Sequence, residues 1–325
     1  MRVLITGGAG FIGSHLAEKR LRSGDEVTVY DNLSLGRRSL LGQWLKHPLM
    51  RFIEADLLDL ERLKRAATDH DVVYHLAANS GGAGGARATD VDLQQGTIAT
   101  YSVLEAMRMA GVKKLVFAST NQVYGGAPVR PPSESDGPLV PTSFHGASKI
   151  ACESLCAAFS HHHGVQAWVY RLGQVIGPHS THGLAHELAD RLLPTPDVLT
   201  VPGDGLRRDA YLHVDDCIAG MEFGVGGSTD AFQVFNLAGE GMTTVRFLAE
   251  RTVEAVESWT GTRASVAYGE TDRGGKGDLA PNQLDGSKLR ALGWRARSGS
   301  DEAVSRAVRE IVAEKAIARG LRARG

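Results

Sequence analysis

A glycine-rich turn near the N-terminus constrains the fold of this chain more than any other feature. Gly7, Gly10 and Gly13 follow an apolar run at residues 3–6 and open a helical pattern at residues 11–23. Glycines at this spacing permit a tight turn and a close approach of the backbone to a pyrophosphate, and the N–H groups at the start of the helix favour its charge. A ligand-free turn between a strand and a helix has the same glycines, so the triplet alone is weak evidence.

Strand and helix patterns alternate through the first half of the chain. Short β-branched runs separated by helical stretches are typical of a parallel sheet covered on both faces. We therefore predict an α/β fold, a doubly wound Rossmann sheet, followed by a smaller mixed α/β lobe. Further strands are expected at residues 27–30, 51–54, 72–76, 115–118 and 167–170, and helices at residues 57–67, 97–110, 147–161 and 300–319.

Composition excludes several classes of protein. The chain has 325 residues, of which 36 are Lys or Arg and 37 are Asp or Glu. This balance leaves no excess of positive charge of the kind that binds nucleic acid or an anionic membrane, so an anionic ligand must be held by local groups. Without an apolar run of ~18 residues or a signal-peptide pattern, the chain is expected to be cytoplasmic. Cys152, Cys156 and Cys217 are expected to be reduced and packed.

Acidic residues at strand ends point to the type of nucleotide. Asp31 ends the second predicted strand, 18 residues after Gly13. A carboxylate there accepts hydrogen bonds from the ribose hydroxyls of an adenosine and repels a 2′-phosphate, which favours NAD over NADP. Arg37 and Arg38 leave NADP open. Asp56 follows the third strand, where it could bind the adenine edge, cap the next helix, or do both.

Several short segments occur in a fixed order along nearly the whole chain. They are GGAGFIGSH, VYDNLSLGRR, VVYHLAA, STNQVYG, GASKIACE, GDGLRRD and HVDDC. Together they resemble the extended short-chain dehydrogenase/reductase family of NAD-dependent nucleotide-sugar epimerases and dehydratases. STHG at residues 180–183 and DRGGKGD at residues 272–278 are most similar to its UDP-glucose 4-epimerase-like members.

The resemblance implies how the chain is divided and what it binds. Residues 1–173 are expected to bind NAD, and residues 174–325 mainly a nucleotide sugar, with some chain returning to the sheet near residues 211–236. A UDP-sugar is the first candidate, with GDP-, dTDP- and CDP-sugars as others, and the helices at 97–110 and 147–161 are expected to form a homodimer. The expected cofactor-binding residues are Gly7, Gly10, Phe11, Ile12, Gly13, Asp31, Asn32, Asp56, Leu57, Leu76, Ala77, Ala78, Ser119 and Lys149.

The catalytic positions show a departure from the family. Lys149 matches the lysine of the family's Tyr-x-x-x-Lys pair, but His145 stands where the tyrosine is expected. An imidazole has an ordinary pKa near 6.5, and the Lys149 charge favours its neutral form, so His145 is expected to act as the general base. Thr120 aligns with the hydroxyl that binds the sugar O4 in the family. Imidazole reaches less far than phenol, which counts against His145 as the base. The alternative to a catalytic His145 is a protein that binds a nucleotide sugar without converting it.

The neighbouring polar residues bear on the reaction and the substrate. Asn121 and Gln122 are expected to bind the substrate. The family's 4,6-dehydratases carry Asp and Glu at these positions, and amides can position a hydroxyl but cannot exchange a proton at neutral pH. This counts against 4,6-dehydration. Gln174, Arg208 and Arg273 are expected to bind the substrate diphosphate, although the usual arginine position is occupied by an aspartate, Asp209.

We therefore expect an NAD-dependent nucleotide-sugar 4-epimerase that acts through a transient 4-keto intermediate. An atypical nucleotide-sugar dehydratase or isomerase, or a non-catalytic homologue, remains the alternative. No metal is expected. The histidines at 161–163 lie at the end of a predicted helix, where an imidazolium interacts favourably with the helix dipole. For His182 and His186, no carboxylate spacing supports zinc, and the family needs none.

Overall fold

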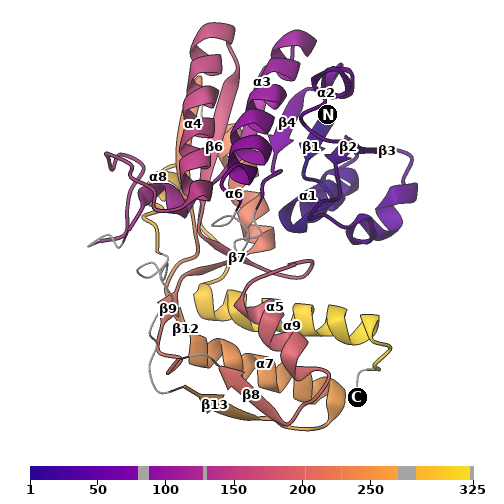
Figure 1. Cartoon of the computed structure of the whole chain (residues 1–325), viewed down its shortest axis with the longest axis vertical. Coiled ribbons are helices and arrows are strands. Elements are labelled where there is room, and N and C mark those ends of the chain that lie inside the picture. Colours follow the sequence, from indigo (N-terminus) through magenta and orange to yellow (C-terminus); the bar gives the residue numbers. More distant parts are fainter. Residues whose placement is uncertain (80–87, 127–129, 202, 228, 270–282, 323–325) are drawn as a thin grey trace. The chain divides into compact units, whose positions relative to one another are not determined.

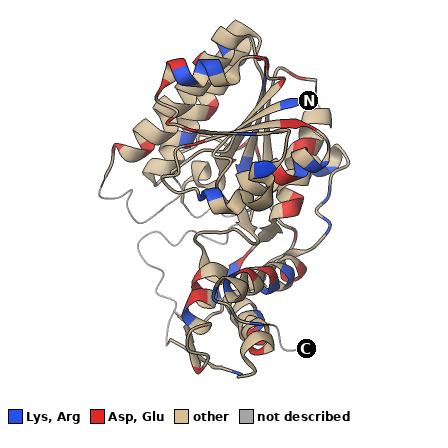
Figure 2. Ribbon diagram, turned by 90° about the vertical axis from the view of Figure 1, so that its right-hand side faces the viewer, with Lys and Arg blue, Asp and Glu red and all other residues tan. Residues whose placement is uncertain are grey.

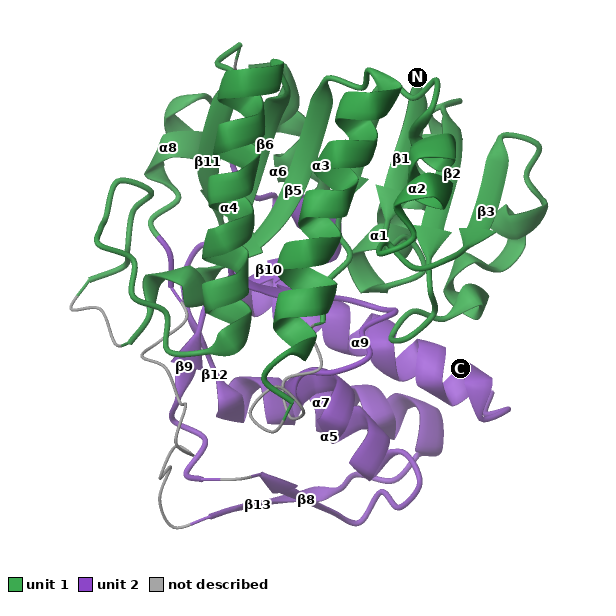
Figure 3. Cartoon of the chain, turned by 45° about the horizontal axis from the view of Figure 1, so that its top comes forward, with its two compact units in different colours: residues 1–172, 218–237, 285–294 green, residues 173–217, 238–284, 295–325 purple. Residues whose placement is uncertain are grey.

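The computed structural model describes residues 1–79, 88–126, 130–201, 203–227, 229–269 and 283–322. It divides into two compact units, drawn in different colours in Figure 3. Unit 1 comprises residues 1–172, 218–237 and 285–294, and unit 2 comprises residues 173–217, 238–284 and 295–325. The chain therefore enters unit 1 three times.

Unit 1 is built on a parallel sheet of seven strands in the order β11-β6-β5-β4-β1-β2-β3. The strand order reverses at β1, so the carboxyl ends of β1 and β4 flank a topological switch point, where such sheets bind ligands. This sheet confirms the predicted fold class. The strands are β1 (Arg2–Thr6), β2 (Glu26–Asp31), β3 (Met50–Glu54), β4 (Val72–His75), β5 (Lys114–Thr120), β6 (Gln166–Leu172) and β11 (Phe232–Leu237).

Helices cover both faces of this sheet (Figure 3). Successive strand residues point to opposite faces, and Leu4, Val73 and Phe117 share one core cluster with residues of α2, α3 and α4. Tyr170 points to the other face, where its hydroxyl donates to the Met221 carbonyl of α6 at 2.7 Å. The helices are α1 (Phe11–Arg22), α2 (Leu60–Ala67), α3 (Ala99–Ala110), α4 (Phe144–His163), α6 (Val214–Gly227) and α8 (Ser287–Ala291), with shorter turns η1 (Arg38–Lys46) and η3 (Asn121–Tyr124).

Three helix starts differ from the sequence prediction. The helix expected at 57–67 begins only at Leu60, because Asp59 rather than Asp56 accepts the capping hydrogen bond, from the Arg62 N–H. The helix α4 begins at Phe144, three residues early, because Ser143 caps it. The residues before α3 form a π-helix, η2 (Leu93–Ile98), a rare conformation that hydrophobic spacing does not reveal.

Unit 2 is a mixed α/β unit with a core of its own. In this core α5, α7 and α9 pack together and contribute Leu188, Leu248 and Val308, respectively. Its strands pair only in twos, β10 with β7, β12 with β9, and β13 with β8. Of the segment expected to return to the sheet, β11 pairs with β6, whereas β10 pairs with β7. The elements are β7 (Gln174–Ile176), α5 (Leu184–Leu192), β8 (Val198–Val201), β9 (Arg208–Asp209), β10 (Tyr211–His213), β12 (Thr243–Thr244), α7 (Val245–Thr260), β13 (Ser265–Tyr268) and α9 (Ser300–Ala318); Figure 1 labels most of them.

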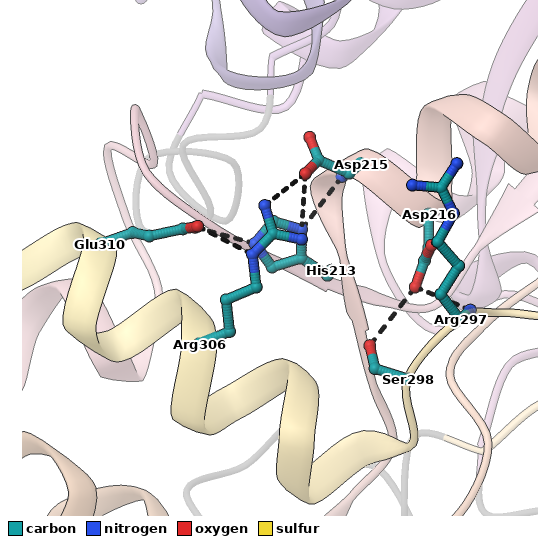
Figure 4. A network of polar contacts seen from close by, with 7 residues as sticks. All are labelled: His213, Asp215, Asp216, Arg297, Ser298, Arg306 and Glu310. Atoms are coloured by element: carbon teal, nitrogen blue, oxygen red, sulfur yellow. Dashed lines mark hydrogen bonds and ion pairs between the residues drawn. The ribbon is translucent and has the colours of Figure 1, made fainter.

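A polar network holds α9 to the end of β10 (Figure 4). His213 is buried, and its Nδ1 accepts the Asp215 N–H while its Nε2 lies 2.9 Å from a Glu310 carboxylate oxygen. Arg306 bridges Asp215 and Glu310. Since a buried imidazole needs partners for both nitrogens, this network is a structural tie within unit 2.

Lys and Arg positions (blue) and Asp and Glu positions (red) both occur along the helices of Figure 2, in agreement with the near-zero net charge. Among the residues described, no helix is long and apolar enough to cross a membrane.

Candidate active site

The glycine turn after β1 is packed too closely for side chains. A Cβ on Gly7 would lie 2.6 Å from the Ala77 nitrogen, and a Cβ on Gly13 would lie 2.3 Å from the Gly7 carbonyl oxygen. Gly7 also has a φ of +70°, which disfavours other residues. Gly10 precedes α1 without a side-chain cap, so the first N–H groups of α1 receive no side-chain partner from it. This cradle fits a pyrophosphate.

Asp31 lies at the carboxyl end of β2 beside this turn. Its buried carboxylate accepts the Ala9 N–H at 3.0 Å and the Leu33 N–H at 2.8 Å. Burial raises the pKa of Asp31, and these two hydrogen bonds oppose the rise. A carboxylate held in this way keeps lone pairs that can accept from ribose hydroxyls. Gly36 packs closely against it, because a Cβ at this position would lie 2.8 Å from a carboxylate oxygen of Asp31.

The residues next to Asp31 form a small cluster. The Asn32 amide donates to the Asp56 carboxylate at 2.9 Å, and that carboxylate also accepts the Leu58 N–H. The structure thus brings Asp31, Asn32 and Asp56 together. Arg38, one of the two cations that left NADP open, lies over the Phe52 ring at 4.9 Å.

The remaining cofactor candidates also belong to unit 1. Ala77 follows β4 and lies against Gly7, with Leu76 and Ala78 on either side of it. Leu57 is buried in the core, and Phe11 and Ile12 open α1. Their contact with a cofactor stays a prediction.

His145 and Lys149 lie one turn apart at the start of α4. The buried Lys149 ammonium donates to the Ala118 carbonyl at 2.7 Å and lies 4.6 Å from the Phe117 ring centre. The His145 side chain is 23% exposed, so solvent and ligands can reach it. Burial lowers the pKa of His145, and the Lys149 charge lowers it further, while Asp92 raises it. Burial also lowers the pKa of Lys149.

The end of β5 packs against the first turn of α4. Thr120 Oγ1 accepts the Gln122 N–H and donates to the Asn121 amide oxygen at 3.2 Å. The Gln122 amide oxygen accepts from Ser143 Oγ at 2.7 Å, and the same hydroxyl accepts the Gly146 N–H. The Gln122 amide therefore helps to hold the turn that carries His145, whereas the Asn121 amide is held by Thr120.

Ser119 faces the protein interior. Its hydroxyl donates to Glu153, whose carboxylate forms a buried ion pair with Arg171 at 2.8 Å. Arg171 also donates to the Tyr124 hydroxyl, which donates to Asn236 Oδ1 at 2.7 Å. This arrangement directs the hydroxyl of Ser119, a predicted cofactor residue, toward α4.

The predicted diphosphate-binding residues lie in unit 2 or outside the described residues. Gln174 opens β7 and Arg208 lies in β9, both with exposed side chains, and Asp209 is buried beside Arg207. Arg273 and the whole DRGGKGD segment, residues 272–278, lie outside the described residues. In the part of the chain that is described, no three His, Cys, Asp or Glu residues are grouped to hold a metal, and His186 pairs with Asp190.

Sequence reasoning missed two buried polar groups of unit 1. His75 ends β4 with its ring nitrogens 2.7 Å from the Thr6 hydroxyl and 2.9 Å from the Thr100 hydroxyl, and burial lowers its pKa to about 3. It therefore stays neutral and joins β1, β4 and α3. A histidine inside the apolar run VVYHLAA was the available signal. Asp92 lies beside His145, and no sequence signal marked it.

A model of the NAD dependent epimerase/dehydratase family matches residues 3–238. The chain belongs to this family. Membership confirms the resemblance read from the sequence motifs and the expected cofactor, NAD.

Relatives of this chain include enzymes named for several different reactions. It is 30% identical to the UDP-glucose 4-epimerase of Mycolicibacterium smegmatis, over 95% of this chain and 97% of the relative. It is 31% identical to a dTDP-glucose 4,6-dehydratase of an Actinoplanes species, over 95% and 97%. The UDP-glucuronic acid decarboxylase 1 of Xenopus tropicalis is 31% identical over 226 residues, and the chain spans about half of its length (52%).

Among solved structures, the family member is similar to the Thermus thermophilus UDP-glucose 4-epimerase in complex with NAD. The two share 32% identity with a TM-score of 0.79, over 95% of this chain and 98% of the other. Because an epimerase and a dehydratase are equally similar in sequence, the choice between reactions depends on the residues of the site.

Proposed function

We propose that the protein is an NAD-dependent nucleotide-sugar 4-epimerase with His145 as its general base. The observation that carries this proposal is the state of His145. It is accessible at the start of α4, and burial and the charge of Lys149 hold its pKa below the ordinary imidazole value, so it is neutral at pH 7. A neutral imidazole is ready to accept a proton from a sugar hydroxyl.

The cofactor-binding residues fit NAD. The glycine cradle would accommodate the pyrophosphate at the start of α1, and the Asp31 carboxylate would accept hydrogen bonds from the adenosine ribose. When bound, NAD supplies the acceptor for a hydride from the sugar carbon. The buried Lys149 ammonium has donors left for the nicotinamide ribose, as the family resemblance implies.

The proton steps belong to His145 and Thr120. His145 takes the proton of the sugar 4-hydroxyl, whose oxygen keeps the electron pair and becomes the carbonyl oxygen of a 4-keto sugar. Thr120 is proposed to hydrogen-bond the same oxygen. After the ketose has turned over in the site and C4 has regained its hydride on the opposite face, the imidazolium returns its proton to the oxygen, so that the C4 configuration is inverted.

The residues beside Thr120 argue against 4,6-dehydration. That reaction needs an acid and a base for C5 and C6, yet Asn121 and Gln122 are amides whose oxygens accept hydrogen bonds from Thr120 and Ser143. Neither amide can exchange a proton at neutral pH. These residues support a reaction that needs one base only.

The test is a substrate screen with the whole chain. The purified protein, with NAD, is incubated with UDP-, dTDP-, GDP- and CDP-glucose and with the corresponding galactose nucleotides, and the sugar configuration is followed by proton NMR. We expect one of these to be converted to its 4-epimer. A 4-keto-6-deoxy product would instead establish the dehydratase alternative, and no conversion of any nucleotide sugar would contradict the proposed activity.

Substitution of His145 tests its role separately. His145→Ala is expected to lose activity by roughly the 10²–10⁴-fold that general-base catalysis contributes. His162→Ala is the matched control, because His162 is exposed at the other end of the same helix. If turnover appears only in His145→Tyr, the wild-type protein is the non-catalytic homologue, as the missing tyrosine first suggested.

We also propose that the protein forms a homodimer through α3 and α4. The support beyond the family resemblance is an apolar surface at η2 and α3, where Leu93, Ile98 and Tyr101 are 40–50% exposed. Sedimentation analysis of Tyr101→Asp, with Leu292→Asp as a control at a distant exposed leucine, tests this. A wild-type monomer would contradict it.

A further inference from the structure

Asp92 is a buried carboxylate that faces the proposed base. It is 5% exposed, and its Oδ1 lies 3.5 Å from Nδ1 of His145, 53 positions away in sequence. The carboxylate also acts on Lys149, whose pKa it raises against the effect of burial. A buried carboxylate is costly unless charges or donors compensate it, so this location needs a reason.

The local backbone holds Asp92 at this place. Ser148, on α4 three residues after His145, donates its hydroxyl to the Asp92 carbonyl at 2.8 Å and lies 3.0 Å from the Thr97 hydroxyl. A Cβ on Gly96 would lie 2.2 Å from the same Ser148 oxygen, so the two helices touch through a glycine. Asp92 is therefore fixed against the face of α4 that carries His145.

The π-helix η2 begins directly after Asp92. A π-turn takes up one more residue than an α-turn and is frequent at functional sites. The wide turn lets the chain contact Ser148 through Gly96 and Thr97 while Asp92 remains at the level of His145.

We propose that Asp92 is a positioning residue for His145. This inference rests on the proposed function. The Asp92 carboxylate accepts the Nδ1–H of His145, which leaves the lone pair of Nε2 for the sugar hydroxyl. In the proton step the O–H bond of the sugar breaks, an N–H bond forms at Nε2, and the oxygen keeps the electron pair. The imidazolium that results is stabilised by the Asp92 carboxylate.

The separation of 3.5 Å is long for a hydrogen bond. Catalytic hydrogen bonds are often long without substrate and shorten as charge develops. The charged groups that act on His145 are Lys149 on its own helix and Asp92 opposite, and they act in opposite directions. Asp92 thus offsets the loss of basicity that Lys149 imposes on the imidazole.

The first experiment is kinetic. Asp92→Asn keeps the shape of the side chain but removes its charge. With the sugar nucleotide that the NMR screen identifies, we expect kcat to fall by roughly 10- to 100-fold, since misplacement of a catalytic group by ~1 Å costs about 100-fold, while KM changes less than about threefold. Asp90→Asn is the matched control, because Asp90 is exposed two residues earlier. Asp92→Glu is expected to recover part of the rate.

The second experiment does not depend on turnover. The protein is labelled with ¹³C at Cε1 of histidine, the His145 signal is identified by its loss in His145→Gln, and its pKa is measured by NMR titration without substrate. Removal of the carboxylate in Asp92→Asn is expected to lower this pKa relative to wild type and to Asp90→Asn. A titration that is unchanged in Asp92→Asn overturns the inference, as does a kcat of Asp92→Asn equal to that of Asp90→Asn.

The outcomes separate this inference from the proposed function. If His145→Ala keeps wild-type activity, the proposed base is wrong and Asp92 has no catalytic role, whatever the titration shows. If His145→Ala is inactive but Asp92→Asn matches its control, only the inference on Asp92 fails. If no nucleotide sugar is converted, the titration alone decides whether Asp92 and His145 interact.

Discussion

The buried ion pair between Glu153 and Arg171 gives a stability prediction that follows directly from the structure. Their side chains are 8% and 5% exposed, and Arg171 contacts the carboxylate through Nε and through a terminal nitrogen at 2.8 Å. Ser119 also donates to Glu153. Glu153→Ala therefore leaves a buried guanidinium without its counter-ion and a buried hydroxyl without its acceptor.

The size of the effect can be estimated from its parts. Removing one partner of a buried ion pair costs about 3–5 kcal/mol. The Tyr124 hydroxyl still accepts from Arg171 in the variant, and the guanidinium remains over the Tyr124 ring at 4.8 Å. These contacts limit the loss, so we expect Glu153→Ala to lower the free energy of unfolding by about 3 kcal/mol, at the lower end of this range.

Glu105→Ala is the matched control. Glu105 pairs with Arg108 on the surface of α3 at 2.6 Å, and exposed pairs contribute about 0–1 kcal/mol. Urea unfolding followed by circular dichroism and by tryptophan fluorescence measures both variants, and agreement of the two probes checks that a single transition is observed. Equal losses in the two variants would refute the reasoning. Glu153→Met/Arg171→Met is expected to recover part of the loss, because it removes both charges.

Four further predictions concern the cofactor, the base and unit 2. Asp31→Asn is expected to weaken NAD binding about 10- to 100-fold, the equivalent of roughly 1.5–3 kcal/mol for hydrogen bonds to a charged group; an unchanged Kd in calorimetry would contradict the ribose contact. Gly7→Ala is expected to abolish NAD binding and lower Tm, because its Cβ would lie 2.6 Å from the Ala77 nitrogen; a wild-type Tm and Kd would show that the turn is looser. Log kcat/KM is expected to rise with pH, because only the neutral form of His145 accepts a proton. The midpoint of the rise should lie below about 6.5, the ordinary pKa of imidazole, because burial and Lys149 lower the pKa of His145. A rise that continues above pH 8 would exclude His145 as the base. His213→Gln is expected to destabilise α9 by about 1–3 kcal/mol through its loss of the Glu310 contact, seen as faster hydrogen exchange in α9 than in α7.

The parallel sheet was predictable because its strands are buried on both faces. Such strands read as short apolar runs bounded by turns, and runs such as residues 27–30 and 115–118 correspond to β2 and β5 with shifts of one or two residues. The turn after β1 was equally legible, because glycine is required by the close approach of Gly7 to Ala77. Helix starts were less predictable, since Asp56 and Asp59 are both good caps and only the fold selects between them.

The full set of charges around His145 could not be predicted, because one of them comes from a distant part of the chain. Lys149 is four residues away on the same helix and was visible in the sequence. Asp92 precedes a π-helix, and its distance from His145 depends on the contact of Gly96 with Ser148. No periodicity encodes such a contact, because the residues that make it are 52 positions apart.

The exchange of a phenol for an imidazole alters what the surrounding charges must do. A tyrosine base has an ordinary pKa near 10, so a nearby lysine makes it a usable base by lowering that value. An imidazole near 6.5 is already neutral at pH 7, and the same lysine only weakens it as a proton acceptor. A carboxylate opposite Lys149 acts in the other direction, and Asp92 has this place at 3.5 Å from Nδ1 of His145. The Asp92 carboxylate therefore offsets the loss of basicity that Lys149 imposes on His145, as electrostatics requires if this site is to abstract a proton. This pairing argues for a catalytic His145 over a protein that has lost its activity.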